Sequence, residues 1–206
     1  MTSAAVRKGE LTRQAILEQA ARMAARVGLE GLTIGVLADE LQLSKSGLFA
    51  HFKSKEALQL QVLEFGIARF VERVIRPALA APRGEKRVHA LFEHWLEWPK
   101  SSGLAGCMFV AFSTELDDRT GPVRDRLVQG QKDWLDVIAN AVRTGVAEGD
   151  FREDVDAEQF AHELYGIMLG GHHALRLLRS RGAVDRTRRA FARLLDDARV
   201  AEKAKG

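Results

Sequence analysis

Near the N-terminus, apolar residues recur at three- and four-residue spacing, which predicts an amphipathic helix. Positions spaced in this way fall on one face of an α-helix. Gly28 follows the last of them and is the residue type best suited to a position just past a helix end, so we expect the first helix to end there. The apolar set is Ile16, Leu17, Ala20, Ala21, Ala24 and Val27.

Two shorter apolar sets follow, separated by a turn at Gln42-Leu43. Thr33 is placed to cap the first of these helices. Ser44 is placed to cap the second, in which Leu48 and Phe52 return to the same face at i, i+4. We therefore expect three short helices around one small core. The buried face of the middle helix would consist of Ile34, Leu37, Ala38 and Leu41.

The rest of the chain also shows helical spacing and no convincing strand alternation. Ser54 would cap a long helix that is expected to fail at Pro77. A buried strand is the alternative over 107–112, since short apolar runs are ambiguous by periodicity, and the helical surroundings favour a helix. These patterns predict an all-α protein. Its later helices are expected over 88–98, 107–116, 123–148, 157–181 and 185–200.

Composition places the chain among globular proteins, with 46% hydrophobic residues, 29% charged residues and 4 prolines. Cys107 stands alone, so an intramolecular disulfide is impossible and a reducing compartment is the simplest setting. Neither a signal-like apolar region nor a run long enough for a membrane span is present. We expect a soluble, cytoplasmic protein.

The formal net charge of +3 permits a polyanionic partner. Its distribution is uneven. The first 57 residues carry eight basic and six acidic residues, whereas the segment from Arg176 onward carries ten basic and four acidic residues. Charge alone would place a nucleic-acid contact near the C-terminus.

The helix pair from Thr33 to Phe52 has the pattern of a helix-turn-helix, whose second helix presents small and polar side chains to the major groove. Free N–H groups in the first turn of that second helix attract phosphate, and Gly47 lets the backbone come close. Flanking hydroxyl and ammonium groups add phosphate donors. The candidate DNA-binding residues are Thr33, Ser44, Lys45, Ser46, Gly47, Leu48, Phe49, Ala50, His51, Lys53 and Lys55.

Three segments carry a resemblance to a known family: TRQAIL at 12–17, LTIGVLA at 32–38 and SKSGLFAHFKSKEAL at 44–58. In order and spacing the chain from Arg7 to Ala68 resembles the tetracycline-repressor (TetR) family. The resemblance implies a homodimeric regulator, mostly a repressor, that leaves its operator when a small-molecule inducer binds. It also implies a DNA-binding domain over 9–69, joined by a long helix to a helical ligand-binding and dimerisation domain over 70–206.

The chain departs from the family pattern at two positions. Phe49 stands where members usually carry tyrosine, so a phosphate-bonding hydroxyl is lost. Ala50 stands where a larger polar residue is common, and offers at most a methyl contact to thymine. Base reading would then fall on Lys45, Ser46 and His51.

A dimer on two half-sites one DNA turn apart needs a wide two-fold interface. The last two helices are the candidates, and Gly166 and Gly170 would allow close helix approach. We expect a four-helix bundle across the two-fold axis. The predicted interface residues are Phe160, Leu164, Ile167, Gly171, Leu175, Phe191, Leu194 and Leu195.

Aromatic and soft side chains gather in the middle helices, where the family keeps its inducer pocket. A packed core is the alternative reading of such a stripe. Few charges fall on these faces, so the inducer would be largely apolar or aromatic, with His172 or His173 as a polar anchor. The candidate ligand-binding residues are Phe65, Phe92, Trp95, Phe109, Phe112, Trp134, Met168 and His172.

Two other kinds of sensor are alternatives on the same scaffold. Cys107 would serve as a redox switch if its pKa were lowered, but its apolar neighbours Met108, Phe109 and Val110 favour a raised pKa. A metal site is disfavoured because the histidine pairs His89/His94 and His172/His173 do not share a helix face. We expect neither a metal nor a cofactor.

The sequence gives little support to functional classes other than a regulator. The acid pairs Asp117-Asp118 and Asp196-Asp197 come without a nucleophile, a phosphate loop or a metal-spaced partner, so we expect no enzyme. A helical protein-interaction bundle without DNA binding is the remaining alternative, and the helix-turn-helix pattern argues against it.

Overall fold

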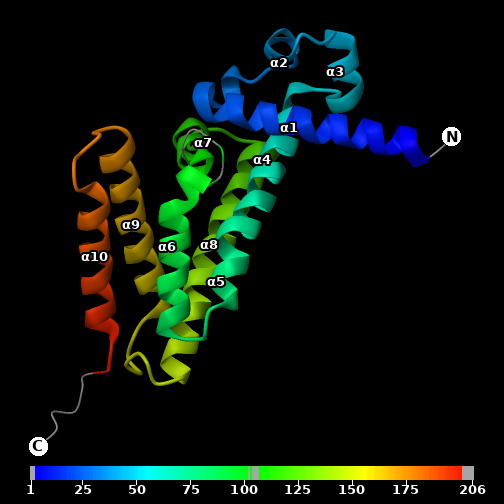
Figure 1. Ribbon diagram of the computed structural model, residues 1–206. Coiled ribbons are helices and arrows are strands. Elements are labelled where there is room, and N and C mark those ends of the chain that lie inside the picture. Colours follow the sequence, from blue (N-terminus) through cyan, green and yellow to red (C-terminus); the bar gives the residue numbers. More distant parts are fainter. Residues whose placement is uncertain (1–2, 102, 104–106, 201–206) are drawn as a thin grey trace, which may run out of the picture. The chain divides into compact units, whose positions relative to one another are not determined.

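The computed structural model describes residues 3–101, 103 and 107–200, and most of this chain is helical (Figure 1). No strand occurs in these ranges, and one isolated antiparallel bridge joins Phe151 to Arg199. The all-α prediction is confirmed. In chain order the elements are α1 (Ser3–Gly31), α2 (Ile34–Leu41), α3 (Lys45–Phe52), α4 (Lys55–Phe70), a π-helical turn (Val71–Ile75), α5 (Arg76–Ala80), α6 (Glu85–Ser101), α7 (Met108–Leu116), α8 (Pro122–Ala147), α9 (Ala157–Arg176) and α10 (Ala183–Ala198).

The chain folds into two compact units. The first contains Met1–Val71 and Trp98–Gly130, and the second contains Glu72–Glu97 and Gln131–Gly206. Helices α6 and α8 therefore contribute to both units. Three charges of the basic C-terminal segment, on Glu202, Lys203 and Lys205, lie outside the described residues.

Two prolines do not end helices where we expected them to. Helical backbone continues through Pro77, which occupies the first turn of α5, where a missing N–H costs no intrahelical bond. The helix expected over 88–98, directly before Pro99, is α6, which begins at Glu85, includes Pro99 and ends at Ser101. Neither proline ends its helix as predicted.

Other predicted boundaries shift by a few residues. Helix α9 ends at Arg176 rather than at Arg181, because the chain turns through Arg179 and Gly182, which both have positive φ. The stretch over 107–112 is helical from Met108 onward, so the strand alternative is excluded. Val27, expected on the buried face of α1, is 53% exposed.

The core of the first unit lies between α1, α4 and α7. Helix α1 contributes small side chains such as Ala20, Ala21 and Ala24, all fully buried, and packs against both other helices. Helix α4 comes close to the start of α7 at Gly66, where a Cβ would lie 2.3 Å from Met108 Sδ. A side chain larger than hydrogen at position 66 would therefore displace Met108.

Helix α1 breaks at Gly28, whose φ of 80° and ψ of 169° only glycine adopts readily. Glu115 of α7 satisfies the backbone beyond the break: its carboxylate accepts hydrogen bonds from Leu29 N (2.7 Å) and Glu30 N (2.6 Å). Gln59 of α4 donates from Nε2 to Leu29 O at 2.6 Å. Leu29 is fully buried, so its backbone groups need partners: its N–H depends on Glu115, and its C=O accepts from Leu32 N at 3.1 Å as well as from Gln59.

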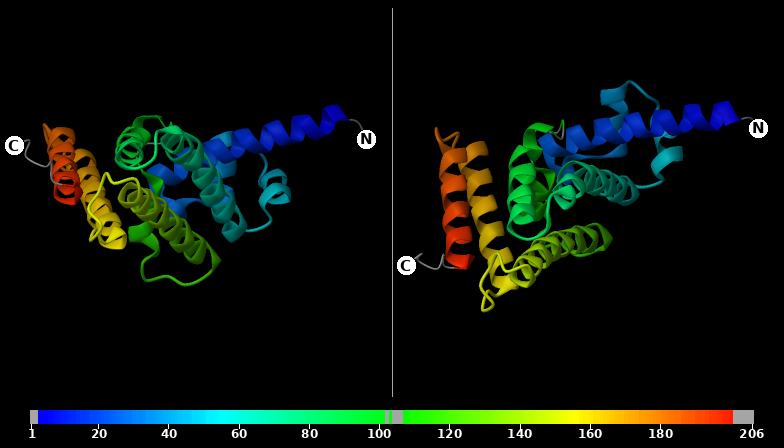
Figure 2. Two further views of the ribbon diagram at one scale, coloured as in Figure 1. Left: turned by 90° about the horizontal axis from the view of Figure 1, so that it is seen from below. Right: turned by 60° about the horizontal axis from the view of Figure 1, so that its bottom comes forward.

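In the second unit α9 and α10 run antiparallel and side by side in the views of Figures 1 and 2. They touch at Gly171, where a Cβ would lie 2.6 Å from Oγ1 of the buried Thr187. The Phe92 ring of α6 stacks on Phe191 of α10, with centroids 4.0 Å apart. Aromatic stacking of this kind adds to the apolar area buried.

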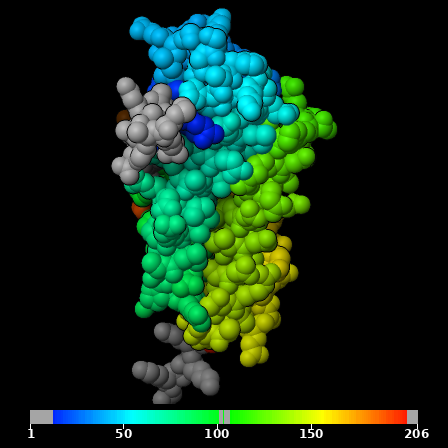
Figure 3. Space-filling view, turned by 90° about the vertical axis from the view of Figure 1, so that its right-hand side faces the viewer, coloured from blue at the N-terminus to red at the C-terminus, as the bar shows by residue number. Residues whose placement is uncertain are grey.

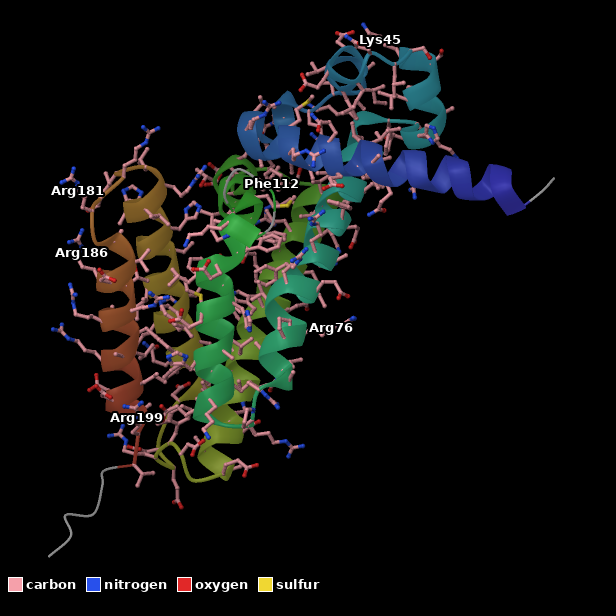
Figure 4. The ribbon with its side chains drawn as sticks, viewed as in Figure 1. Lys45, Arg76, Phe112, Arg181, Arg186 and Arg199 are labelled. Carbon is pink, nitrogen blue, oxygen red and sulfur yellow. The ribbon has the colours of Figure 1, made fainter. Side chains whose placement is uncertain are left out.

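Two arginines, one in α10 and one directly after its last residue, hold α10 to α6 at the surface. Arg199, labelled in Figure 4, donates to Glu85 from Nε at 2.8 Å, and Arg188 donates to Glu93 from Nε at 2.9 Å. The hydrogen bond from Arg199 lowers the pKa of Glu85, and that from Arg188 lowers the pKa of Glu93. Asp150 adds a cap on α6, accepting from Glu85 N at 2.9 Å.

A Gly28→Ala variant tests the break in α1. A Cβ at this position would lie 2.8 Å from Glu115 Oε1. We expect the free energy of unfolding to fall by about 2–4 kcal/mol, from backbone strain and a weakened charge-assisted hydrogen bond. Gly149→Ala is the matched control, with a φ of +81° and nothing near its Cβ. Urea denaturation giving equal losses for both variants would contradict the role assigned to Glu115.

A Glu85→Gln variant tests the link from α10 to α6 through its pH dependence. Because the folded-state pKa of Glu85 is lowered, its stabilisation is complete above the unfolded pKa of about 4.3 and is lost as the pH falls through the folded value. We expect a loss of about 0.5–1 kcal/mol at pH 7 that shrinks at pH 3, measured by urea denaturation. Glu153→Gln, at an exposed position, serves as control, and a loss that does not depend on pH would argue against the ion pair.

Candidate nucleic-acid interface

Side-chain caps start both short helices of the predicted helix-turn-helix. Thr33 Oγ1 accepts a hydrogen bond from Val36 N at 3.1 Å, and Ser44 Oγ accepts one from Gly47 N at 3.1 Å. Such caps satisfy backbone donors that have no partner within the helix. Both caps lie where the sequence predicted them.

The turn between the two helices is closed by backbone hydrogen bonds. Gln42 adopts a left-handed conformation, with φ at 53°, and ends α2. Leu43 N then donates to Ala38 O at 3.0 Å. The reversal brings the apolar faces together, and Leu37, Leu48 and Phe52 are almost completely buried. The prediction of a small shared core is confirmed, but Ile34 and Leu41, two of the four residues expected on the buried face of α2, are only half-buried.

The outer face of α3 is exposed and mostly polar. Because Leu48 and Phe52 face the core, the residues between and before them point away from it. Figure 3 shows the outward surface of α2 and α3 in light blue. Leu48 is only 1% exposed, so its side chain supports the helix and does not reach DNA, contrary to its place among the candidates. The exposed candidates are Ser44, Lys45, Ser46, Gly47, Phe49, Ala50, His51 and Lys53.

Lys45 lies over the first turn of α2, and Figure 4 shows it at the outer end of the helix pair. A Cβ built on Gly35 would lie 3.6 Å from Lys45 Cε and 3.7 Å from its Nζ. Thr33, the cap of α2, is 3.8 Å from the same point. An ammonium group, a hydroxyl and a helix N-terminus are thus brought together, a combination that attracts phosphate oxygens.

Lys55, another predicted phosphate donor, already has a partner in the free protein. Its Nζ donates to Glu30 Oε2 at 2.9 Å, and this hydrogen bond lowers the pKa of Glu30. A phosphate at Lys55 would therefore have to share the ammonium group with a carboxylate. Sequence reasoning missed this pairing, because Glu30 lies in a different helix and no local pattern links the two residues.

The predicted ligand-binding residues divide between the two units. Phe65, Phe109 and Phe112 belong to the first unit, where Phe109 packs edge-on against Phe70, with ring centroids 5.5 Å apart. Phe112, labelled in Figure 4, is fully buried. In this unit the aromatic side chains fill a core.

The remaining five belong to the second unit: Phe92, Trp95, Trp134, Met168 and His172. The first four are buried, whereas His172 of α9 is half-buried. His172 Nε2 is itself buried and has no hydrogen-bond partner among the described residues. Burial lowers the pKa of this imidazole, and the charges of Arg176 and His173 lower it further. At neutral pH it therefore presents an uncharged polar nitrogen.

The structure places most of the predicted dimer residues inside the single chain. Half-buried Ile167, Gly171 and Leu175 are the exceptions, and the α9–α10 contact already occupies Gly171. By contrast, a Cβ on Gly166 or Gly170 would meet nothing within 4 Å. The buried residues are Phe160, Leu164, Phe191, Leu194 and Leu195.

Cys107 directly precedes α7 and is buried, and desolvation raises the pKa of its thiol. A buried thiol with a raised pKa is a poor nucleophile, which weighs against a redox switch. Over residues 3–101, 103 and 107–200 no group of His, Cys, Asp and Glu comes together in a way that would hold a metal ion. In the same part of the chain no helix is long and apolar enough to cross a membrane.

Sequence models of two families match the chain. The one described as "Bacterial regulatory proteins, tetR family" matches residues 16–62, which include the caps, the turn and α3. The one described as "Tetracyclin repressor-like, C-terminal domain" matches residues 84–191.

Individual proteins are similar over most of the chain. The transcriptional repressor KstR2 of Mycobacterium tuberculosis is 30% identical over 158 residues, which are 74% of this chain and 72% of KstR2. The repressor NemR of Escherichia coli K12 is 23% identical over 172 residues, or 82% and 86% of the two chains. A TetR regulator of Chloroflexus aurantiacus superposes with a TM-score of 0.82 and 27% identity, over 95% of this chain and all of that one.

Proposed function

Since the chain belongs to the TetR family and is a DNA-binding transcriptional repressor with a ligand-binding domain, we propose how its residues divide that work. Residues 9–69 bind operator DNA, and residues 70–206 bind an inducer and form a homodimer. The protein acts in the cytoplasm, where a bacterial operator is found. Its relatives are regulators rather than enzymes.

The observation that carries the DNA-binding proposal is the arrangement around Lys45. The capped first turns of α2 and α3 present free N–H groups, and the Lys45 ammonium lies beside Thr33 and Gly35. This cluster holds a phosphate and sets the register of the protein on the duplex. Ser46 and His51 are exposed on the same helix, where they contact base edges.

The inducer that we propose is small and largely apolar or aromatic. His172 supports this proposal, because a buried nitrogen without a partner costs free energy that a hydrogen bond to a ligand would recover. The neighbouring residue Met168, one turn earlier on α9, is fully buried and apolar. Such surroundings favour an uncharged ligand that offers one hydrogen bond.

The homodimer that we propose uses the outward face of α9. Gly166 and Gly170 leave room for a second helix to approach closely, and Leu177 is 71% exposed beyond them. His162 and His173 lie on the same stripe and are exposed. This surface replaces the buried side chains predicted earlier, which already pack within one chain.

Replacing Lys45 by alanine tests the DNA-binding proposal. The dimer carries two copies of Lys45, so the variant loses one charge-assisted hydrogen bond to phosphate in each half-site. On a duplex containing the promoter region upstream of its own coding sequence, we expect an affinity about a hundredfold lower, or about tenfold for each half-site. The slope of log K against log salt should become shallower by about 1.8, which corresponds to about 0.9 for each phosphate contact. Lys86→Ala, at an exposed position of α6, is the matched control. Equal binding by Lys45→Ala and the wild type, measured by fluorescence anisotropy, would refute the assignment.

Replacing Gly170 by arginine tests the dimer. Position 170 has open space around it, so the variant should fold, and arginine favours a helix more than glycine does. We expect dimers for the wild type and monomers for Gly170→Arg in sedimentation velocity at micromolar concentration, because a charged side chain blocks close helix approach. Ala68→Arg, on an exposed position of α4, should remain dimeric. A monomeric wild type would contradict the proposal.

A further inference from the structure

The outer face of α3 carries an aromatic ring that the fold does not use. Phe49 is 56% exposed, although it lies between the buried residues Leu48 and Phe52 in sequence. Burying a phenylalanine side chain away from water is strongly favourable. Because Phe49 stays exposed, the fold does not obtain most of this free energy. Ala50 is exposed beside it and adds a methyl group.

The surroundings of Phe49 indicate what kind of surface it meets. Lys45 precedes it by one helical turn, and Lys53 follows it by one turn. His51 is exposed on the same helix. An exposed apolar ring with a lysine one turn before it and another one turn after it suits a polyanion that also offers an apolar group. A phosphate does not pair with the ring itself, because a phenyl group has no hydrogen-bond donor.

The major groove of DNA offers one apolar group, the C5-methyl of thymine. The other groups that base pairs present there are hydrogen-bond donors and acceptors. A phenyl ring placed against them removes water without replacing its hydrogen bonds, and that desolvation is unfavourable. Against a thymine methyl the same ring displaces no hydrogen-bonded water, and the contact buries apolar area on both groups.

We infer that Phe49, with Ala50 beside it, is a specificity-determining residue that reads thymine methyl groups in each operator half-site. The inference rests on the proposed function, because it requires α3 to enter the major groove. It assigns sequence preference to an apolar contact, whereas Lys45 and Thr33 hold the phosphate backbone and do not depend on sequence.

The test uses operators selected from a random-sequence duplex library with the wild-type protein at fixed salt. Each thymine of the selected half-site is then replaced by deoxyuridine, which removes the methyl and leaves the base-pairing groups in place. We expect affinity to fall about fourfold at one or two thymines, in keeping with burial of a single methyl group. With Phe49→Ala, thymine and deoxyuridine should bind equally at those positions.

Two controls separate methyl reading from other effects. Val36→Ala removes a side chain that is 46% exposed on α2 and should keep the full preference for thymine over deoxyuridine. In the second, the sensitive thymine is replaced by cytosine and then by 5-methylcytosine. Restoring the methyl should tighten binding of the wild type and leave Phe49→Ala unchanged. Thermal unfolding checks that Phe49→Ala folds, as expected for an exposed position.

The outcomes distinguish the inference from the function on which it rests. If no sequence is enriched and the wild type binds all duplexes equally, the proposed operator binding itself fails. If an operator is enriched but deoxyuridine is tolerated at every thymine, methyl reading is wrong while the proposed function stands. A preference for thymine that survives in Phe49→Ala overturns the role of Phe49 in the same way.

Discussion

The backbone of Leu29 is the point that ties three helices of the first unit together. Gly28 ends the regular part of α1, and the buried residue after it must find partners for its N–H and its C=O. Leaving either group unpaired would cost about 1–3 kcal/mol. Helix α7 supplies Glu115 to the N–H, while the C=O accepts from Gln59 of helix α4 and from the nearby Leu32 N. The positions of both helices relative to α1 are therefore fixed by hydrogen bonds as well as by apolar packing.

Helix α3 depends on the packed helices α1, α4 and α7 because few of its own side chains are buried. Only Leu48 and Phe52 of its side chains are buried, so its outer face is free to contact DNA. Local hydrogen bonds compensate for the small core: Ser44 caps α3, and Ser54 caps α4 immediately after it, accepting from Ala57 N at 3.0 Å. Caps and two buried apolar side chains hold the helix in place. All of its remaining positions are therefore available for DNA recognition.

These physical causes explain what the sequence could predict. Caps act over three residues, so Thr33 and Ser44 could be identified from their neighbours, as could the periodic core positions. The partnership of Glu115 with Leu29 spans 86 residues and leaves no local pattern. Helical spacing also placed Gly166 and Gly171 on one broad face of α9, yet only the fold shows that Thr187 packs against Gly171 and that Gly166 stays open.

The charge distribution misleads for a related reason. The basic C-terminal segment suggests a polyanion site, but several of its arginines are engaged within the second unit. Arg188 binds Glu93, Arg199 binds Glu85 and Asp196, and Arg186 donates to Ser180 Oγ at 2.6 Å. A net charge counts such groups as if they were free. Affinity for phosphate instead depends on where an unshared cation lies beside backbone donors, and one lysine at two helix N-termini meets that condition better than a larger surplus of paired arginines.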